Sequence, residues 1–466
     1  MLKKIVVLLA GLMFGNVKGD ELITYPVPAA VMYTNHNDDF TVRVRKPGGE
    51  WIDLFEYNVK VDLDAPQEAS MAYFDFSGRV EVAVRKNNGR FQSVKVRPSS
   101  CGIHTKVQGS TVFFNLDKAC KVSVEFDGDK LHNLHLFGNP IEQNLPDPKD
   151  PNVIYFGPGV HQPKDLPGDE FNIPSGKTVY IAGGAVVKAK FVVDHAKDVK
   201  IIGRGILDQP LRGVEIRNSQ NVEIGGVIIV NPKHYSIYGG QSNNITIRNI
   251  KSFSSNGWSD GIDLMSCSDV TIDDVFMRNS DDCIAIYGHR WEFYGNARNY
   301  KVTNSILWAD VAHPINIGLH GNTENAAEVI EKLHFKNIDI LEQDEDDPNY
   351  QGCIAISDGD FNSVKNITFE DIRIDDFEEG QLLNLRVVNN PKYNSGPGQG
   401  IENILFKNIS YSGVNLIPSV IAGLDDEHSI KNIRFENLKV NGSVVLNADS
   451  ANIRIGKYTK GIAFSK

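Results

Sequence analysis

A short strand motif recurs through the later two-thirds of this 466-residue chain and limits the folds it can adopt. Each copy opens on a polar residue, often Asn or Asp, and continues with alternating apolar residues, as in a strand with one buried face. The first four copies begin at residues 198, 221, 244 and 269, so at steps of 23, 23 and 25. Later copies begin at residues 299, 332, 366, 403 and 432, at steps of 29 to 37. This repeat predicts a right-handed parallel β-helix over residues 141–466, with the longest loops on the binding face.

A β-propeller is the competing fold for repeated short strands. Its repeats are longer and do not open on a polar residue in this way, so we favour the β-helix. Four asparagines also fit the Asn-x-Ser/Thr glycosylation pattern, namely Asn244, Asn366, Asn408 and Asn441. Most of them begin a repeat, where Asn has a structural reason to recur, and we interpret them as turn residues.

Residues 20–140 follow a different pattern, with alternating strands joined by tight turns. Thr41–Arg45 and Val80–Val84 are examples of the strands, and Asn87–Gly89 and Asp127–Asp129 are hairpin turn signals. Antiparallel strands with one polar face predict a small N-terminal antiparallel β-sandwich. A stretch rich in Pro, Asp and Asn, Asn139–Pro151, is the expected linker to the β-helix. The predicted fold class is therefore all-β.

Residues 1–19 have the pattern of a secretory signal peptide. Lys3 and Lys4 form its basic start, and the apolar run Ile5–Phe14 that follows is too short to span a membrane. We expect an exported protein, periplasmic or extracellular, with no membrane span. The formal net charge of −11 disfavours nucleic acids and anionic membranes as partners, because binding to either needs basic patches.

The chain has five cysteines, an odd number. Cys101 and Cys120 flank a hairpin-like segment and are candidates for a disulfide bond. Cys267, Cys283 and Cys353 each adjoin an apolar strand, and we interpret them as buried free thiols. No spacing of Cys or His indicates a zinc site.

Carboxylates concentrate between Trp258 and Arg290, where two acidic clusters occupy the same phase of the repeat. Asp260 stands in Ser-Asp-Gly-Ile-Asp, and the pair Asp281 and Asp282 stands in Ser-Asp-Asp-Cys-Ile, a step of 21 residues further on. Each cluster precedes a short apolar run. If this step is one turn of a solenoid, the three carboxylates stack on one face.

Carboxylates held close together repel one another, which raises the pKa of at least one and prepares it to act as a general acid near neutral pH. A second, ionised carboxylate can activate water, and glycoside hydrolysis requires such a pair. The structural alternative is that Asp beside Gly makes turns between strands. That alternative explains Asp281 and Asp282 less well, because adjacent acids before a buried strand cost stability unless something uses them.

Three segments together resemble signature blocks of glycoside hydrolase family 28, the polygalacturonases. They are Ser-Asp-Gly-Ile-Asp at 259–263, Asn-Ser-Asp-Asp-Cys-Ile-Ala-Ile at 279–286 and Ala-His-Pro-Ile-Asn-Ile-Gly at 312–318. The family's blocks are Asn-Thr-Asp-Gly, Asp-Asp-Cys and Gly-His-Gly-x-x-Ile-Gly, and the 21-residue step is similar. The added N-terminal sandwich is more like the related family 49, the dextranases and isopullulanase. The resemblance implies inverting hydrolysis by three aspartates, with no metal and no cofactor.

The resemblance also implies roles for individual residues. Asp281 resembles the general acid, and Asp260 and Asp282 resemble the pair that positions and deprotonates water. His313 resembles the family's histidine, which supports ionisation of the acid. Without its flanking Ile-Asn-Ile-Gly, His313 would be equally well explained as a satisfied core histidine.

Two departures from the family leave the sugar open. Trp258 and Ser259 replace Asn-Thr of the first block. The fourth block, Arg-Ile-Lys, binds the substrate carboxylate in the family, but the corresponding coil reads Gly-Cys-Ile-Ala-Ile at 352–356 and has no basic residue. An acidic sugar would lose a charge-assisted partner there, for which Arg386 or Arg290 is a candidate substitute. A pectic galacturonan and a neutral dextran- or pullulan-type glucan are therefore both candidate substrates.

Aromatic and basic side chains near the blocks are the expected sugar contacts. The predicted substrate-binding residues are Trp258, Tyr287, His289, Arg290, Trp291 and His320. Loop packing is the alternative role for the aromatic members. A separate acidic loop, Asp344–Asp347, is a candidate calcium site, but it lacks EF-hand spacing and a solvated loop explains it better.

The sequence therefore predicts an exported O-glycosyl hydrolase that cleaves α-glycosidic linkages in a polysaccharide or oligosaccharide. A polysaccharide lyase is the first alternative, although a lyase needs a basic residue beside a uronate and the blocks here are acidic. A non-catalytic carbohydrate-binding β-helix is the second alternative. These hypotheses differ in whether Asp281 is required for turnover, and in whether the product is unsaturated.

Overall fold

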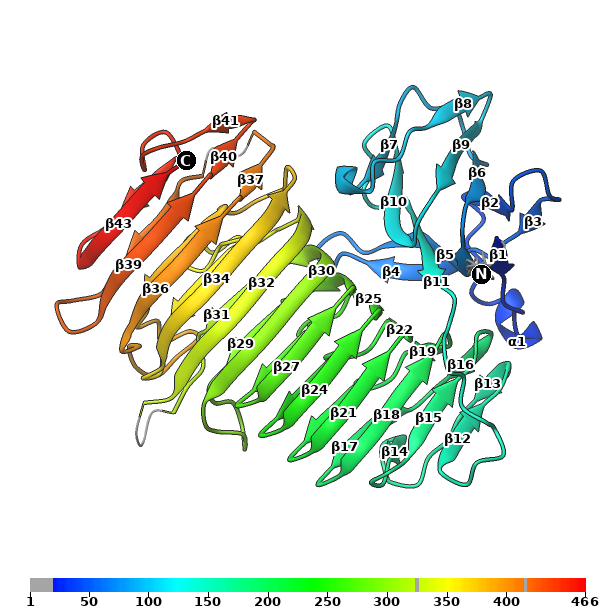
Figure 1. The fold of residues 1–466 in the computed structure, drawn as a ribbon, viewed down its shortest axis with the longest axis horizontal. Helices are drawn as coiled ribbons and strands as arrows, with labels where there is room; N and C mark the ends of the chain where they lie inside the picture. Colours follow the sequence, from blue (N-terminus) through cyan, green and yellow to red (C-terminus); the bar gives the residue numbers. More distant parts are fainter. Residues whose placement is uncertain (1–19, 323–326, 415–416) are drawn as a thin grey trace, which may run out of the picture.

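The computed structural model describes residues 20–322, 327–414 and 417–466. The predicted signal peptide lies outside the described residues. Figure 1 shows two parts, a compact group of strands at the N-terminal end and a long stack of parallel strands that runs to the C-terminus. Within the described residues, no helix is both long and apolar enough to cross a membrane.

The N-terminal part consists of two facing sheets. The six-stranded sheet contains β1 (Glu21–Ile23), β4 (Tyr57–Val61), β5 (Gln67–Ser77), β7 (Val94–Arg97), β10 (Cys120–Phe126) and β11 (Leu134–Pro140). The five-stranded sheet contains β2 (Phe40–Arg45), β3 (Ile52–Asp53), β6 (Val80–Lys86), β8 (Lys106–Gln108) and β9 (Thr111–Leu116). Two short helices, α1 (Ala29–Met32) and η1 (Ser99–Cys101), lie between strands.

The alternation of buried and exposed side chains along each strand explains how these sheets pack. In β2 the side chains of Phe40, Val42 and Val44 are buried, while the residues between them are partly or fully exposed. They share an apolar core with Phe74 of β5 and Val124 of β10 from the other sheet. All strand pairs are antiparallel except β11 with β5, which is parallel. The predicted sandwich is confirmed, with this one exception to its antiparallel pairing.

From residue 153 the chain winds into a parallel β-helix with three strands in most coils. The first ladder contains β12 (Val153–Phe156), β15 (Thr178–Ile181), β18 (Lys197–Gly203), β21 (Gln220–Gly225), β24 (Asn243–Arg248), β27 (Ser268–Asp273), β30 (Ala297–Val311), β32 (Val329–Glu342), β34 (Ser363–Ile374), β36 (Gly400–Lys407), β39 (Ser429–Glu436) and β43 (Thr459–Ser465). The second contains β13 (Gly159–His161), β16 (Ala185–Val187), β19 (Ile206–Asp208), β22 (Ile228–Val230), β25 (Lys251–Phe253), β28 (Phe276–Ser280), β37 (Ser410–Tyr411), β40 (Lys439–Val440) and β41 (Ser443–Val444), of which β41 is antiparallel to β40. These two ladders join into one 21-stranded sheet, because β30, β32 and β34 run through both.

The third ladder is a separate 11-stranded parallel sheet. It contains β14 (Glu170–Asn172), β17 (Lys190–Asp194), β20 (Val214–Arg217), β23 (Ile237–Gly240), β26 (Ile262–Met265), β29 (Ile284–Tyr287), β31 (Ile315–Gly318), β33 (Ile354–Asp358), β35 (Leu383–Val387), β38 (Ser419–Ala422) and β42 (Ile453–Ile455). The parallel β-helix expected from the repeat is thereby confirmed.

The repeated polar residue at each strand opening has a clear structural role. Asn221 and Asn244 both have positive φ, 57° and 53°, a backbone conformation that Asn tolerates better than most residues. The Asn244 side-chain amide donates to Oδ1 of Asn221 at 2.7 Å, and Asn221 donates to Oδ1 of Asp198 at 2.7 Å. Asn403 donates in the same way to Asn366. This ladder of amides is the turn role that the sequence predicted for the recurrent asparagines.

The interior of the β-helix is apolar along its whole length. Ile201, Ile224, Ile247 and Ile272 come from successive coils of the first ladder and are fully buried. Later coils place a phenylalanine at one position, and adjacent rings stack with centroids 4.6–5.0 Å apart: Phe335, Phe369, Phe406, Phe435 and Phe464. Aromatic pairs at such separations add to the stabilisation from buried area.

The N-terminal sandwich docks on the β-helix through buried charges. Arg278 of β28 is fully buried, and its Nε lies 2.9 Å from Oδ2 of Asp310. From the sandwich, Asn133 and His135 accept hydrogen bonds from Nη1 of Arg278, in the tautomer that leaves His135 Nε2 unprotonated. Arg278 and Asp310 both belong to the β-helix, and the two hydrogen bonds from Nη1 join this buried pair to the sandwich. Breaking a buried pair of this kind costs about 3–5 kcal/mol.

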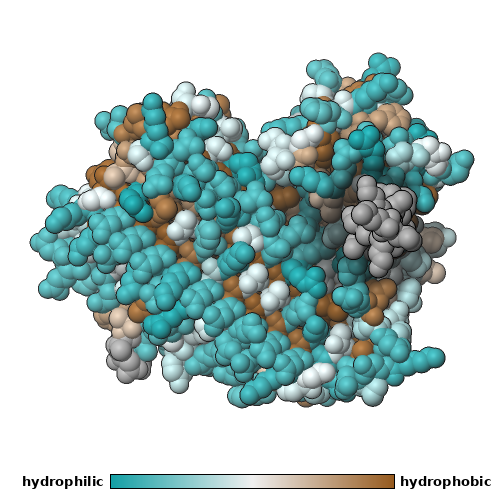
Figure 2. Space-filling model, viewed as in Figure 1, coloured by the Kyte–Doolittle hydropathy of each residue, from teal (hydrophilic) through white to brown (hydrophobic). Residues whose placement is uncertain are grey.

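Figure 2 shows the surface of the view in Figure 1. The visible surface is largely hydrophilic over the 21-stranded sheet and is hollowed between the N-terminal sandwich and the last coils. The acidic blocks identified from sequence belong to the other sheet, the 11-stranded one, and that sheet positions the candidate site.

Candidate active site

Three strands of the 11-stranded sheet begin with the residues of the signature blocks. Ile262 of β26 pairs with Ile284 of β29, which pairs with Ile315 of β31. Because the strands are parallel and in register, the residues that precede them meet at one edge of the sheet. Gly261 donates its N–H to the carbonyl of Asp282 at 2.8 Å, one coil further on. Residues 21 and 31 positions apart in sequence thus become neighbours on adjacent coils.

This edge brings the three predicted catalytic carboxylates together. One oxygen each from Asp260, Asp281 and Asp282 lies within 4.8 Å of the other two. Asp260 and Asp282 are buried, with 4% and 1% of their surface exposed, whereas Asp281 is only partly buried. The clustered carboxylates therefore reach solvent mainly through Asp281.

Asp282 is held by several donors. Asn316 donates its amide to Oδ2 at 2.7 Å, and the hydroxyl of Tyr287 lies 3.3 Å from the same oxygen. His313 approaches Oδ1 with its ring Nδ1 at 2.6 Å and with its backbone N–H at 3.2 Å. Asp260 differs, because its Oδ1 has no hydrogen-bond partner among the described residues. The two buried carboxylates are therefore in very different environments.

These environments separate the pKa values of the carboxyls. Burial, followed by repulsion from Asp282, raises the pKa of Asp281 to about 7. Burial and the neighbouring carboxylates raise the pKa of Asp260 well above its ordinary value. Burial opposes ionisation of Asp282 too, but the charge and hydrogen bonds of His313, with those of Asn316 and Tyr287, lower its pKa. Near neutral pH the cluster thus holds an ionised Asp282 beside carboxyls that retain protons.

His313 is fully buried and bridges Asp282 to the next coil. Burial lowers the pKa of a histidine, but the adjacent Asp282 outweighs burial and raises the pKa of His313 to about 9. A protonated ring has two donors, and here Nδ1 donates to Asp282 and Nε2 donates to the carbonyl oxygen of Tyr350. The sequence assigned His313 to the support of Asp281, whereas its hydrogen bonds fall on Asp282.

A fourth carboxylate, Asp263, belongs to the site and was given no role in the sequence analysis. It is fully buried, and its carboxyl lies within hydrogen-bonding reach of the Asp260 side chain. Burial and then Asp282 raise its pKa well above the ordinary value. The strand alternation of the first block could have identified it, because Asp263 follows the inward-facing Ile262 and must point outward.

The predicted aromatic and basic contacts divide into two groups. Tyr287 is buried against the site, with the guanidinium of Arg290 5.6 Å from its ring centroid and the ring of His320 5.0 Å away. The positive charge of Arg290 favours ionisation of Asp260, Asp263 and Asp281. It therefore lowers their pKa values and offsets part of the rise that burial causes.

The other group lies toward the surface. Trp291 is 45% exposed and stacks on Tyr235, with ring centroids 5.7 Å apart. Trp258 adjoins Asp260 in the chain and is 68% exposed. His289 lies 3.1 Å from the carbonyl of Trp291 through Nε2, so this ring contacts its own loop.

The coil expected to carry the basic fourth block has none, and Arg386 lies one coil further on. Its Nε donates to Oδ1 of Asn384 at 2.8 Å, and its terminal nitrogens contact Asn349 and Pro348. Asn384 is in register with Ala355, which is in register with Asn316 of the site. Arg386 is therefore on the same sheet as the carboxylates, two strands from β31.

Cys101 and Cys120, the candidates for a disulfide bond, are free thiols in the structure, and a hydrogen bond between them lowers the pKa of Cys101. In the acidic loop, Asp344 and Asp346 approach Glu379, with one carboxylate oxygen from each within 4.8 Å of the others. Burial and the surrounding acids raise the pKa of Asp344 to about 7.

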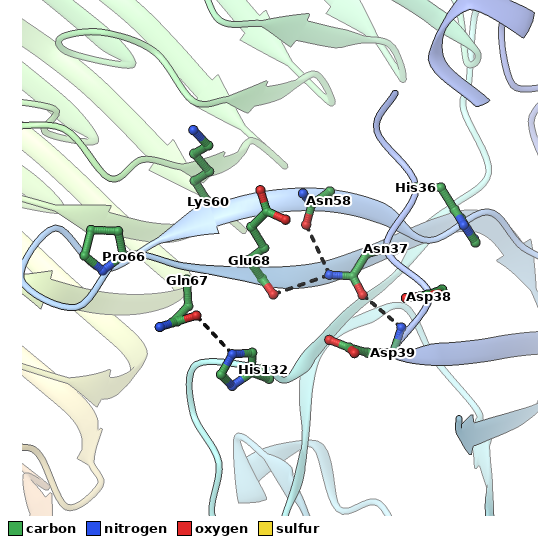
Figure 3. Close-up of a pocket in the computed structure, with 10 residues that line it drawn as sticks. All are labelled: His36, Asn37, Asp38, Asp39, Asn58, Lys60, Pro66, Gln67, Glu68 and His132. Carbon is green, nitrogen blue, oxygen red and sulfur yellow. Dashed lines mark hydrogen bonds between the residues drawn. The ribbon is translucent and has the colours of Figure 1, made fainter. Parts of the chain in front are cut away.

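The cavity in Figure 3 is separate from the carboxylates, and none of the site residues lines it. It lies in the N-terminal part and has a volume of about 570 Å³. Hydrogen bonds join side chains of its wall to one another. Asn37 donates to Asn58, and His132 lies 3.1 Å from Gln67. The aspartates with strongly shifted pKa values cluster at the sheet edge, so the chemistry points there instead.

A β-helix that carries clustered aspartates on one sheet edge defines the class of protein. The chain belongs to glycosyl hydrolases family 28, whose model matches residues 194–459. That match covers more than half of the chain and contains every predicted catalytic residue.

Curated relatives include an exopolygalacturonase, clone GBGE184, from Arabidopsis thaliana, 27% identical over 205 residues. This match covers 43% of the chain and 44% of that relative. The probable endopolygalacturonase D of Emericella nidulans is 22% identical over 270 residues, which are 56% of the chain and 46% of that protein. The chain thus spans about half the length of the curated relatives it matches.

Solved structures show the same fold over nearly the whole chain. Dex49A from Penicillium minioluteum has a TM-score of 0.67 at 14% identity, covering 95% of this chain and 96% of that one. The family 28 exopolygalacturonase of Yersinia enterocolitica has a TM-score of 0.51 at 12% identity, covering 88% and 96%.

Proposed function

We propose that this protein is an exported glycoside hydrolase that cleaves α-glycosidic linkages with inversion. The observation that carries the proposal is the group of three aspartates whose pKa values are driven apart within 4.8 Å. Opposed pKa values in adjacent carboxyls supply an acid and a base at the same pH.

The roles follow from the protonation states. Asp281 keeps its proton up to a pH of about 7 and reaches solvent, so it donates the proton to the departing glycosidic oxygen. Asp282 is ionised and takes a proton from the attacking water. Asp260, buried and neutral, hydrogen-bonds that water and orients it. His313 is a positioning residue, because it keeps Asp282 charged and fixed.

The family resemblance, and not the spacing of the carboxyls, favours inversion. Inverting glycosidases commonly separate their two carboxyls by about 6.5–9.5 Å, and retaining ones by about 5–5.5 Å. The closest oxygens here are within 4.8 Å, which by itself favours retention. The family resemblance favours inversion, because it implies that Asp260 and Asp282 share one attacking water. The anomer released first, measured by proton NMR, decides between them: the opposite anomer supports inversion and the same anomer refutes it.

The proposed reaction uses no metal. Arg290 already supplies positive charge beside Asp260, Asp263 and Asp281, and a neutral Asp281 is required as the acid. A divalent ion on these oxygens would displace that proton, because a cation favours the ionised form.

We propose an acidic, pectic galacturonan as the substrate. The names of the curated relatives support this choice, and so do two arginines near the site. Arg290 faces the carboxylates, and Arg386 lies two strands from β31. Guanidinium groups bind carboxylates through paired, charge-assisted hydrogen bonds. A neutral glucan would gain nothing from them.

The experiment compares wild type with Asp281→Asn on polygalacturonate, methyl-esterified pectin and dextran, with reducing sugar as the readout. We expect release from polygalacturonate by wild type only. Release from dextran alone would refute the acidic substrate. A product that absorbs in the ultraviolet would indicate a lyase, and binding without release by wild type would indicate a carbohydrate-binding solenoid.

Export is tested by fusing residues 1–19 to a reporter and measuring its secretion.

A further inference from the structure

The outward face of the 11-stranded sheet is covered on both sides of the carboxylates. Side chains that point outward from successive strands lie in register, and they would form the floor of any groove along the coils. Each of these side chains is at most 3% exposed. They are Tyr238, Asp263, Ala285, Asn316, Ala355 and Asn384. A polymer lying along these coils would need that floor to be accessible.

The loop of residues 288–296 covers the side toward the N-terminal coils. Phe293 is fully buried, and its ring is so close to the backbone of Gly240 that a Cβ there would lie 2.0 Å from it. Trp291 stacks on Tyr235 and meets Tyr238 edge-on at 5.6 Å. The non-glycine residue Trp291 has φ of 55°, a costly conformation that the surrounding contacts must hold.

Two tyrosines cover the opposite side. Tyr350 and Tyr393 stack with centroids 4.4 Å apart, and the Tyr350 ring meets the His313 ring edge-on at 4.3 Å. Asn316 of β31 donates its amide to the hydroxyl of Tyr350 at 3.0 Å. Phe293 belongs to an apolar cluster outside the solenoid core that also includes Leu319, and Tyr350 and Tyr393 pack against the same cluster.

The carboxylates therefore lie between two packed covers, and Asp281 is the partly exposed carboxyl of the three. We propose that this protein acts on the end of its polysaccharide and removes terminal units, rather than cutting within the chain. An internal segment must leave the site in both directions along the coils. The buried Phe293 occupies one direction, and the partly buried Tyr350 and Tyr393 occupy the other. This inference rests on the proposed hydrolase function.

The first test is the product profile of wild type on size-fractionated polygalacturonate, followed by anion-exchange chromatography together with viscosity. We expect the smallest product from the first time point and little loss of viscosity per bond broken. A ladder of oligomers with rapid loss of viscosity would overturn the inference while leaving the hydrolase function intact.

The second test does not need turnover. Asp281→Asn is titrated with polygalacturonate of two or three defined lengths, and the number of protein molecules bound per chain is measured by calorimetry. Binding at a chain end predicts the same number at every length. A number that grows with length would overturn the inference, even if wild type hydrolyses nothing. If the protein neither cleaves nor binds, both the function and the inference fail.

Variants test whether the two covers, the loop of residues 288–296 and the pair Tyr350 and Tyr393, restrict the protein to chain ends. Replacing residues 291–294 by two glycines, or Tyr393→Ala on the other side, should produce oligomers that wild type does not release. Tyr294→Ala is the control in the same loop, because its side chain is 59% exposed and lies outside the apolar cluster. The half-buried Tyr393 tests the inference if the loop variant does not fold. Terminal products alone from both folded variants would show that the covers do not set the mode of action.

Discussion

Nδ1 of His313 lies 2.6 Å from Oδ1 of Asp282, and both side chains are buried at the point where two coils of the β-helix meet. Because the pKa of His313 is raised to about 9 and that of Asp282 is lowered, the two form an ion pair at neutral pH. The pair fixes which carboxylate of the cluster carries negative charge. The other acids, which have no such partner, keep their protons to higher pH.

Removing the charge of His313 should therefore act through Asp282. His313→Gln retains a polar side chain but no cation, so the pKa of Asp282 rises and the acidic limb of the kcat/KM profile moves to higher pH. We expect kcat to fall by roughly 100-fold or more, the scale of a lost acid–base contribution. His334→Gln is the control, because that ring pairs with Glu370 at the surface of the other sheet. An unmoved acidic limb would contradict the role of the pair.

The pH profile of wild type should be bell-shaped. As the proposed acid, Asp281 must be protonated, so we expect activity to decline as pH rises through about 7. Asp282 must be ionised, so activity also declines at low pH, below its lowered pKa. Steady-state rates between pH 3 and pH 9 provide the measurement. Activity that still increases between pH 7 and pH 9 would exclude Asp281 as the acid.

The same shift predicts a gain in stability from Asp281→Asn. The folded protein holds the Asp281 proton to about pH 7, whereas the unfolded chain loses it near 3.8. The folded state binds more protons in that interval, so its stability falls as pH rises through it. Since Asp281 is partly exposed, we expect the variant to be more stable at pH 8 by on the order of 1 kcal/mol, with no difference below pH 4. Thermal unfolding at the two pH values checks this, and equal melting temperatures at pH 8 would contradict the shift.

Chelation should leave the hydrolase active. EDTA treatment followed by dialysis is expected to change kcat on the preferred substrate less than twofold, because acid, base and positive charge all come from side chains. Loss of activity that returns with a divalent cation would contradict this, and Asp344→Asn would then separate an effect of the acidic loop from one at the active-site aspartates.

Stability of the fold should depend on Arg278, which pairs within the β-helix and also contacts the sandwich. Arg278→Ala removes a fully buried guanidinium that pairs with Asp310, and we expect a loss of about 3–5 kcal/mol in the free energy of unfolding. Arg248→Ala is the matched control, since its side chain is 56% exposed and pairs with Glu223 at the surface. Urea unfolding of both variants provides the comparison. Equal losses would show that burial of the Arg278–Asp310 pair does not add to the stability of the fold.

The repeat in the sequence was sufficient to predict the β-helix, because each coil must bury its apolar residues at the same phase. It also predicted that Asp260, Asp281 and Asp282 would meet, since one coil of a parallel ladder places equivalent residues side by side. The role of Asp263 was missed, although strand alternation turns it to the same face. The hydrogen bond of His313 to Asp282 could not be predicted, because the contact of a side chain one coil away depends on rotamers.

The sequence by itself determined the architecture and which carboxylates cluster, since strand period and coil length are local properties of the chain. Only the tertiary structure decided which carboxylate is charged and how the site is enclosed. Those properties depend on burial and on contacts between segments far apart in sequence, such as Phe293 against Gly240 and Tyr350 beside His313. Desolvation and charge pairing act across space, so the order of residues in the chain does not specify them directly.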